Sequence, residues 1–86
     1  MYNPQLDTFV TAAERGSFTK AAEALCITPT AVIKQINLLE SNLGLKLFER
    51  SHRGLKLTAA GRSVLADAKY IIAYAKEAAV RAREAE

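Results

Sequence analysis

The sequence predicts a mainly α-helical fold, in which three helices form a core, a small β-hairpin follows, and one long helix ends the chain. Apolar residues recur at helical spacing in each of the first three segments, and a capping residue precedes each segment. Apolar and basic residues alternate around Gly54, which is typical of a hairpin. After Gly61 the chain contains neither glycine nor proline. We therefore expect one domain over residues 1–57 and a separate helix over residues 58–86.

The first helix is predicted to open at Asn3-Pro4, a capping side chain followed by proline, and to end at Gly16. Its apolar stripe consists of Leu6, Phe9, Val10 and Ala13. A stripe of this kind needs a partner, so the helix should pack across the next two helices. The residues expected to complete this three-helix core are Leu25, Ile27, Val32 and Ile36.

Two further helices are predicted to follow, separated by a three-residue turn. Ser17 caps the first of them, Thr28-Pro29 opens the second, and Gly44 stops it. The second helix has an apolar face of Val32, Ile36, Leu39 and Leu43 and a polar, cationic face of Thr30, Lys34, Asn37 and Ser41. A short helix crossing a longer one in this way is the helix-turn-helix geometry, in which the second helix enters the DNA major groove. The alternative is an ordinary helical hairpin with a solvated polar face.

The segment after Gly44 predicts a short β-hairpin with a basic tip. Its anchors on the helical core are expected to be Leu47, Phe48, Leu55 and Leu57. The tip, Ser51 to Gly54, is expected to carry His52 and Arg53 into solvent. Beside a recognition helix such a hairpin is a wing, and Arg53 is expected to reach the minor groove. The alternative is a solvated loop, and a single histidine does not indicate a metal site.

The last helix is capped by Thr58 and is about 43 Å long at about 1.5 Å per residue, more than a small globule needs. Six of its residues step at alternating spacings of three and four, and they predict a coiled-coil seam for a homodimer: Leu65, Ala68, Ile72, Ala75, Ala79 and Ala82. The alternatives are a helix that packs back on the core and an amphipathic membrane helix. Its balanced charge argues against the membrane.

Composition and charge narrow the function classes. The net charge is +3, but residues 1–45 carry −1, residues 46–62 carry +4 and the remainder is neutral, so the positive charge is a local patch. No nucleophile and base are suitably spaced, so neither an enzyme nor a cofactor is expected. One cysteine excludes an internal disulfide, and without a signal peptide or an eighteen-residue apolar run we expect a soluble protein of the reducing cytoplasm. Cys26 itself is expected to be a small buried residue in the turn.

The chain resembles the N-terminal DNA-binding domain and linker helix of LysR-type transcriptional regulators. The matching stretches are LDTFVTAAERGSFTKAAEAL at residues 6–25, QINLLESNLGLKLFER at 35–50 and LTAAG at 57–61. The resemblance implies a winged helix-turn-helix that dimerises through antiparallel linker helices and binds double-stranded DNA at an inverted repeat. It also implies a separate effector-binding domain. We expect this chain to be a fragment that stops before that domain.

The resemblance and the helical pattern together assign DNA contacts to ten residues: Ser17, Thr19, Thr28, Pro29, Thr30, Ile33, Lys34, Gln35, Arg50 and Arg53. The recognition helix departs from the family pattern, because Thr28, Pro29 and Thr30 replace a usual serine, glutamine and proline or serine. Ile33 cannot donate a hydrogen bond and is expected to touch a thymine methyl group. Arg50 either is held by Glu40 or touches phosphate. The competing function class is a helical protein-interaction module, which the alanine-rich last helix would serve equally well.

Overall fold

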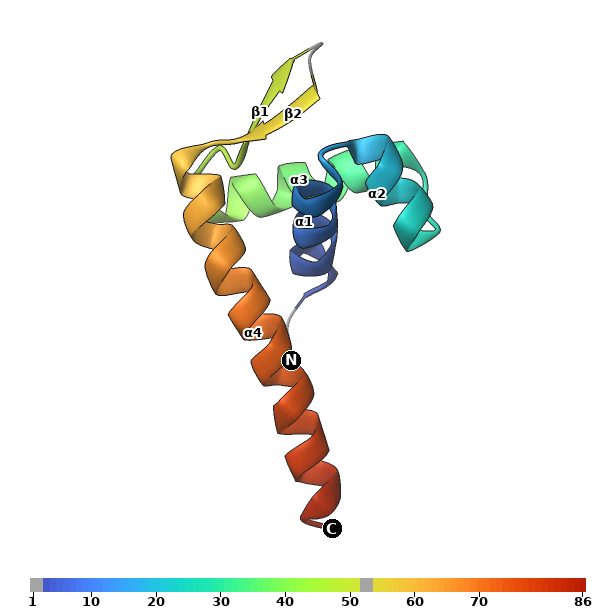
Figure 1. Cartoon of the computed structure of the whole chain (residues 1–86), viewed down its shortest axis with the longest axis vertical. Coiled ribbons are helices and arrows are strands. Elements are labelled where there is room, and N and C mark those ends of the chain that lie inside the picture. Colours follow the sequence, from blue (N-terminus) through green and yellow to red (C-terminus); the bar gives the residue numbers. More distant parts are fainter. Residues whose placement is uncertain (1–2, 52–53) are drawn as a thin grey trace.

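The computed structural model describes residues 3–51 and 54–86. Its elements follow the order α1 (Pro4–Arg15), α2 (Phe18–Leu25), α3 (Pro29–Leu43), β1 (Phe48–Ser51), β2 (Gly54–Leu57) and α4 (Ala59–Glu84). Figure 1 shows α1, α2 and α3 gathered in one cluster, the hairpin projecting at one end of it, and α4 running away from it. The molecule is therefore elongated, with extents of 51 × 27 × 19 Å. The mainly α-helical winged helix-turn-helix architecture predicted above is confirmed.

The core lies where the three helices meet the base of the hairpin. Its largest fully buried side chains are Phe9, Ile36, Leu47 and Val32. Ala21 and Ala22 are also buried, and these small side chains let α2 approach α1 and α3 closely. The rings of Phe9 and Phe48 lie 5.4 Å apart between centroids, so a residue of the wing closes the core that the helices begin. Each large aliphatic or aromatic side chain buried here stabilises the fold by about 1.5–3 kcal/mol.

The helix boundaries follow their capping residues. The side chains of Asn3, Ser17, Thr28 and Thr58 each accept a hydrogen bond from a backbone N–H group in the first turn of the next helix. The first and third helices end at Gly16 and Gly44, both in the left-handed region at φ 68°. All four predicted starts and both glycine stops are confirmed.

Two predictions of burial are wrong in the turn between α2 and α3. Cys26 is exposed, because it occupies the left-handed position (φ 58°) that ends α2. The N–H of Cys26 bonds to the Glu23 carbonyl and that of Ile27 to the Ala22 carbonyl, which is the Schellman arrangement. This closure turns both side chains outward, and Ile27 is 36% exposed. Leu43, also expected in the core, is 45% exposed, because it is the last residue of α3, where the chain reverses.

The hairpin and the start of α4 are joined to each other by backbone contacts. In the antiparallel pair, Phe48 lies opposite Leu57 and Ser51 lies opposite Gly54. Thr58 donates its backbone N–H to the Leu47 carbonyl oxygen at 3.0 Å. A side chain on Gly61 would lie only 2.1 Å from that same oxygen, so the first turn of α4 can dock here only with glycine at this position.

Among the described residues, those of α4 that belong to the core cluster or pack against it lie in the first half of the helix. Ala68 is 1% exposed and belongs to the core cluster, with Val64 and Leu65 packed against it. Lys69 and Glu14 form an ion pair at 3.1 Å that links α4 to α1 on the surface. Beyond this region α4 extends past the globule (Figure 1). Over the described residues, no helix has the length and apolarity needed to cross a membrane.

Candidate nucleic-acid interface

A groove of about 380 Å³ separates the two helices of the helix-turn-helix from the hairpin. Its walls come from the start of α2, the start of α3 and both strands of the wing. Five of the ten residues assigned to DNA from the sequence line it: Ser17, Thr19, Pro29, Ile33 and Arg50. The fold thus brings together, in one concave surface, residues that span 34 positions of the chain.

The hydroxyl groups of Ser17 and Thr28 cap helices and can also donate a hydrogen bond to a ligand. The Ser17 hydroxyl accepts from the Lys20 N–H at 3.2 Å, and the Thr28 hydroxyl accepts from the Ala31 N–H at 3.1 Å. Each cap uses an acceptor lone pair, so the hydroxyl hydrogen stays available to donate to a phosphate or a base edge. Thr19 and Thr30 are exposed beside them. The start of each helix also offers backbone N–H groups, which favour an anion.

Side chains in the middle of the recognition helix point in two directions, some toward the groove and others toward α1. Ile33 is 36% exposed and lines the groove, so the expectation that it faces away from the core is confirmed. Lys34 is exposed next to it. Gln35 points the other way, because its side-chain oxygen accepts a hydrogen bond from the hydroxyl of the buried Thr8 on α1. Gln35 therefore joins α1 to α3, and its assignment to DNA stays a prediction.

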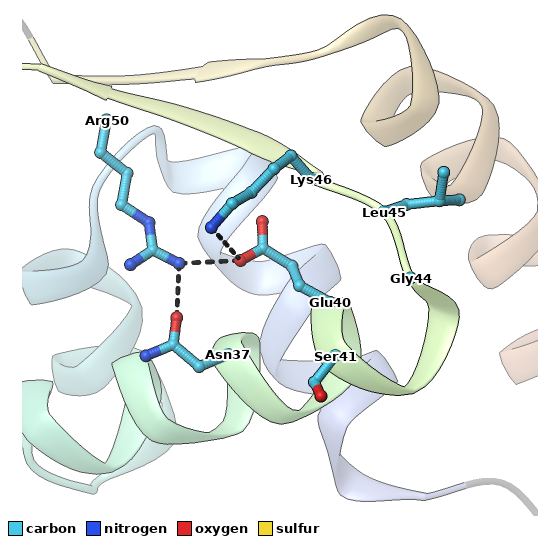
Figure 2. Close-up of a pocket in the computed structure, with 7 residues that line it drawn as sticks. All are labelled: Asn37, Glu40, Ser41, Gly44, Leu45, Lys46 and Arg50. Carbon is cyan, nitrogen blue, oxygen red and sulfur yellow. Dashed lines mark hydrogen bonds and ion pairs between the residues drawn. The ribbon is translucent and has the colours of Figure 1, made fainter.

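Arg50 is held by Glu40, as the first of its two alternatives expects (Figure 2). Its Nη2 group lies 3.0 Å from the Glu40 carboxylate and donates to the Asn37 side-chain oxygen at 2.8 Å. The guanidinium also lies over the Phe18 ring, 5.2 Å from its centroid, in cation–π geometry. One side chain on β1 therefore touches α2 and α3. Arg53, which the sequence assigns to the minor groove, lies outside the described residues, as does His52.

A second groove of about 600 Å³ follows the other half of the recognition helix. It is lined by Asn37, Glu40, Ser41, Gly44, Leu45, Lys46 and Arg50 (Figure 2). Arg50 lines both grooves and stands between them. Asn37, Lys46 and Phe18 also belong to this interface, although none of them is among the ten residues assigned to DNA from the sequence. The sequence does contain a signal for the contacts of Glu40. Glu40 is an acid beside the core stripe, and the cations Lys46 and Arg50 follow it closely enough to pair with it.

The surface of α4 differs from the predicted seam. Ala68 is 1% exposed and lies in this chain's own core, so its assignment to the seam is corrected. Leu65 packs against that core but is only half-buried, and its assignment stays a prediction. Ala75 is 8% exposed, Ile72 and Ala79 are half-buried and Ala82 is exposed. Besides Val80, the large exposed apolar side chains of α4 lie one step round the helix at Tyr70, Ile71 and Tyr74, which are 72%, 44% and 53% exposed. We call these three residues the tyrosine patch.

A scan against family models matches residues 4–62 to the bacterial regulatory helix-turn-helix proteins of the lysR family. The chain belongs to the LysR family. The match covers all three helices of the core, the wing and the docking turn of α4, so it contains both grooves. The relatives named below are a transcriptional activator and a transcriptional regulator.

Two curated relatives represent the LysR proteins that this chain is similar to. The HTH-type transcriptional activator AllS of Salmonella typhimurium is 48% identical over 75 residues, which are 86% of this chain and 24% of AllS. The HTH-type transcriptional regulator ClcR of Pseudomonas putida is 43% identical over 81 residues, which are 94% of this chain and 28% of ClcR. The chain spans about a quarter of the length of these curated relatives.

Two solved LysR structures have nearly the same fold. The crystal structure of the CbnR DNA-binding domain in complex with DNA superposes with a TM-score of 0.95 at 41% identity, covering 99% of this chain and 98% of that one. The BenM DNA-binding domain in complex with benA site 1 DNA superposes with a TM-score of 0.91 at 33% identity, covering 98% and 94%. The winged helix-turn-helix and the long last helix are thus common to all three.

Proposed function

We propose that this chain binds double-stranded DNA with the groove between its helix-turn-helix and its wing, as the DNA-binding domain of a LysR-type transcriptional regulator. The observation that carries the proposal is this groove, because it gathers hydroxyl donors, an apolar side chain and a guanidinium on one concave surface. CbnR and BenM, which share the fold, were each crystallised with DNA. Phosphates bind hydroxyl, backbone N–H and guanidinium groups, and base edges add apolar contacts.

In this proposal the first half of α3 enters the major groove. Thr28 and Thr30 then donate to phosphate or to base edges, and Lys34 supplies a cation near the backbone. Ile33, the most apolar exposed residue of this half, contacts a thymine methyl group. Ser17 and Thr19, at the start of α2, face the phosphates on the flank. Arg53 in the wing is proposed for the minor groove, where narrow A·T-rich DNA attracts arginine.

We further propose that two copies of the chain associate through α4 and present two recognition helices to an inverted repeat. One copy alone offers a single recognition helix and a single wing, a small surface for specific binding. The tyrosine patch lies on α4, and its rings stack at 6.4 Å between centroids. Exposed aromatic and aliphatic side chains grouped in this way favour a protein partner. The seam residues Ile72, Ala79 and Ala82 lie round the helix from this patch, and they stay predicted contacts of the partner.

The complete protein is proposed to act in the cytoplasm and to carry an effector domain after α4, as its family implies. The relatives that match this chain are about four times as long as the match. Any effector, and the choice between activation and repression, belongs to that remaining part.

A DNA titration tests this proposal. A labelled duplex carrying the consensus selected from a random pool is titrated with the parent, with Lys34→Ala and, as the matched control, with Lys76→Ala on α4. The logarithm of Kd should vary linearly with the logarithm of salt concentration, and the Lys34→Ala slope should be smaller by about one for each phosphate that the missing ammonium group would neutralise. The control should retain the parent slope. A parent that selects no duplex, or a Lys34→Ala variant that binds like the parent, would contradict the proposal.

A further inference from the structure

Resting on the proposed DNA binding, we propose that Glu40 is a positioning residue for it. Glu40 lies on the recognition helix, and its side chain is only 6% exposed. Its buried carboxylate holds the wing and the Arg50 side chain in place against that helix (Figure 2). Glu40 therefore raises DNA affinity through Arg50 and the wing, although it is an acid in a surface that binds a polyanion.

The Glu40 carboxylate accepts from three N–H groups of the segment that enters the wing. Oε2 accepts from the backbone N–H groups of Leu47 at 2.8 Å and Phe48 at 3.3 Å. Oε1 accepts from Arg50 Nη2 at 3.0 Å, and Lys46 Nζ lies 3.9 Å away. Buried backbone N–H groups need an acceptor, and an ionised carboxylate offers one on each oxygen. One side chain of α3 thus fixes both the backbone and a side chain of β1.

Arg50 is oriented by this arrangement. Both hydrogens of its Nη2 are engaged, one by Glu40 and one by Asn37, and its flat face lies on Phe18. Because both two-donor edges of a guanidinium include Nη2, the remaining N–H groups of Nη1 and Nε can each donate singly to a phosphate. An arginine held in one orientation loses less conformational entropy on binding than a free one. The two alternatives for Arg50 therefore combine: Nη2 is structural, and a remaining N–H group binds DNA.

Because Glu40 is negatively charged, the proposal can be tested by whether Glu40→Gln strengthens or weakens DNA binding. Glu40→Gln raises the formal net charge from +3 to +4. If Glu40 acted only through its charge, removing it would strengthen DNA binding, because fewer negative charges oppose the phosphates. Glutamine fits the same space but presents an NH₂ group to one of the two sets of donors. Loss of positioning therefore predicts weaker binding in spite of the more favourable charge.

The experiment measures Kd for the selected duplex and for mixed-sequence duplex DNA with the 86-residue chain and four variants, well below their melting temperatures. Glu40→Gln should raise Kd for the selected duplex about tenfold, close to the loss expected for Arg50→Gln. In the double variant the Glu40 change should lose most of its effect, because Arg50 is already gone. Val32→Ala, a buried change on the same helix, is the control for stability and should bind like the parent.

Equal or tighter binding by Glu40→Gln would overturn the proposal, and so would additive effects in the double variant. A loss no larger than that of a Val32→Ala variant of equal folded fraction would overturn it as well. If Glu40→Gln does not fold, Asn37→Ala replaces it in the test. This change at an exposed position removes the hydrogen bond that Arg50 Nη2 donates to Asn37. It should weaken DNA binding when Arg50 is present and have no effect in the Arg50→Gln background. A parent that binds no duplex would instead contradict the proposed function, which separates the two failures.

Discussion

Two groups of aromatic rings in this molecule show how differently its two ends are stabilised. Phe9, Phe18 and Phe48 lie in or against the core, with centroid separations of 5.4 and 5.7 Å along the cluster. The phenylalanine rings meet at tilted and edge-on angles, whereas Tyr70 and Tyr74 stack at 6.4 Å on the surface of α4. The centroid separations are similar, and the larger difference is the apolar area removed from water. The phenylalanines stabilise a single chain, whereas the tyrosines contribute little until another surface covers them.

This difference separates folding from assembly. Residues 3–57 supply every buried member of the core cluster except Ala68, which comes from α4. Gly61 and the Lys69–Glu14 ion pair also join the start of α4 to the rest of the fold. The second half of α4 depends on its helical propensity and, in the proposed dimer, on a partner. Substitutions in the first turn of α4, where Gly61 meets the wing, should therefore change the free energy of unfolding. Substitutions in the tyrosine patch should change the affinity of association.

The largest effect is expected for Gly61→Ala. In an ordinary helix interior alanine is about 1 kcal/mol more favourable than glycine. Here the new Cβ would lie 2.1 Å from the Leu47 carbonyl oxygen, so α4 or the wing must move. We expect a loss of about 3 kcal/mol in the free energy of unfolding, measured by urea denaturation. Ala66→Gly, at an exposed position of the same helix, should lose only about 1 kcal/mol. A gain in stability for Gly61→Ala would show that α4 does not dock in this way.

A smaller effect, confined to association, is expected for Ile71→Glu. Ile71 is 44% exposed in the single chain, so the change should leave the core folded. In a dimer it would bury an unpaired carboxylate, which should weaken association about a hundredfold, or about 2.7 kcal/mol. Light scattering would report the molar mass, and DNA affinity should fall with it. Lys76→Gln makes the same change in net charge at an exposed position on the opposite face of α4, and it should remain dimeric. A parent that is monomeric at high micromolar concentration would remove α4 as an interface.

The sequence predicts well what local rules decide. Capping residues and glycine stops place every helix start and the ends of α1 and α3, and alternation around Gly54 places the hairpin. Contacts between distant residues are harder. The Phe18–Arg50 contact spans 32 positions, and Gln35 can be assigned to α1 only by knowing that Thr8 lies opposite it. Helical spacing alone does not say how far along a stripe the packing partner reaches.

The burial errors have the same cause. The stripe of α3 is apolar to its last residue, yet the core ends near Leu39, and Leu43 lies beyond it. On α4 the seam has the expected spacing, but its first half faces this chain's own core at Ala68 and not a second copy. Burial is the usual state of cysteine and is the reason to expect it for Cys26. The left-handed turn that ends α2 instead directs it outward.

The smallest change in stability is expected for Ile33→Ser. This variant should instead change the DNA sequence that the protein prefers. Ile33 is 36% exposed and lines the groove beside Arg50, so its replacement removes little core packing. The free energy of unfolding should stay within about 1 kcal/mol of the parent, whereas the same truncation at the fully buried Ile36 should cost several. Selection from a random duplex pool should then show less preference for thymine at one step of each half-site, because a hydroxyl replaces the methyl contact. An unchanged consensus would mean that Ile33 does not touch the bases. A melting temperature that falls as far as that of Ile36→Ser would mean that it belongs to the core.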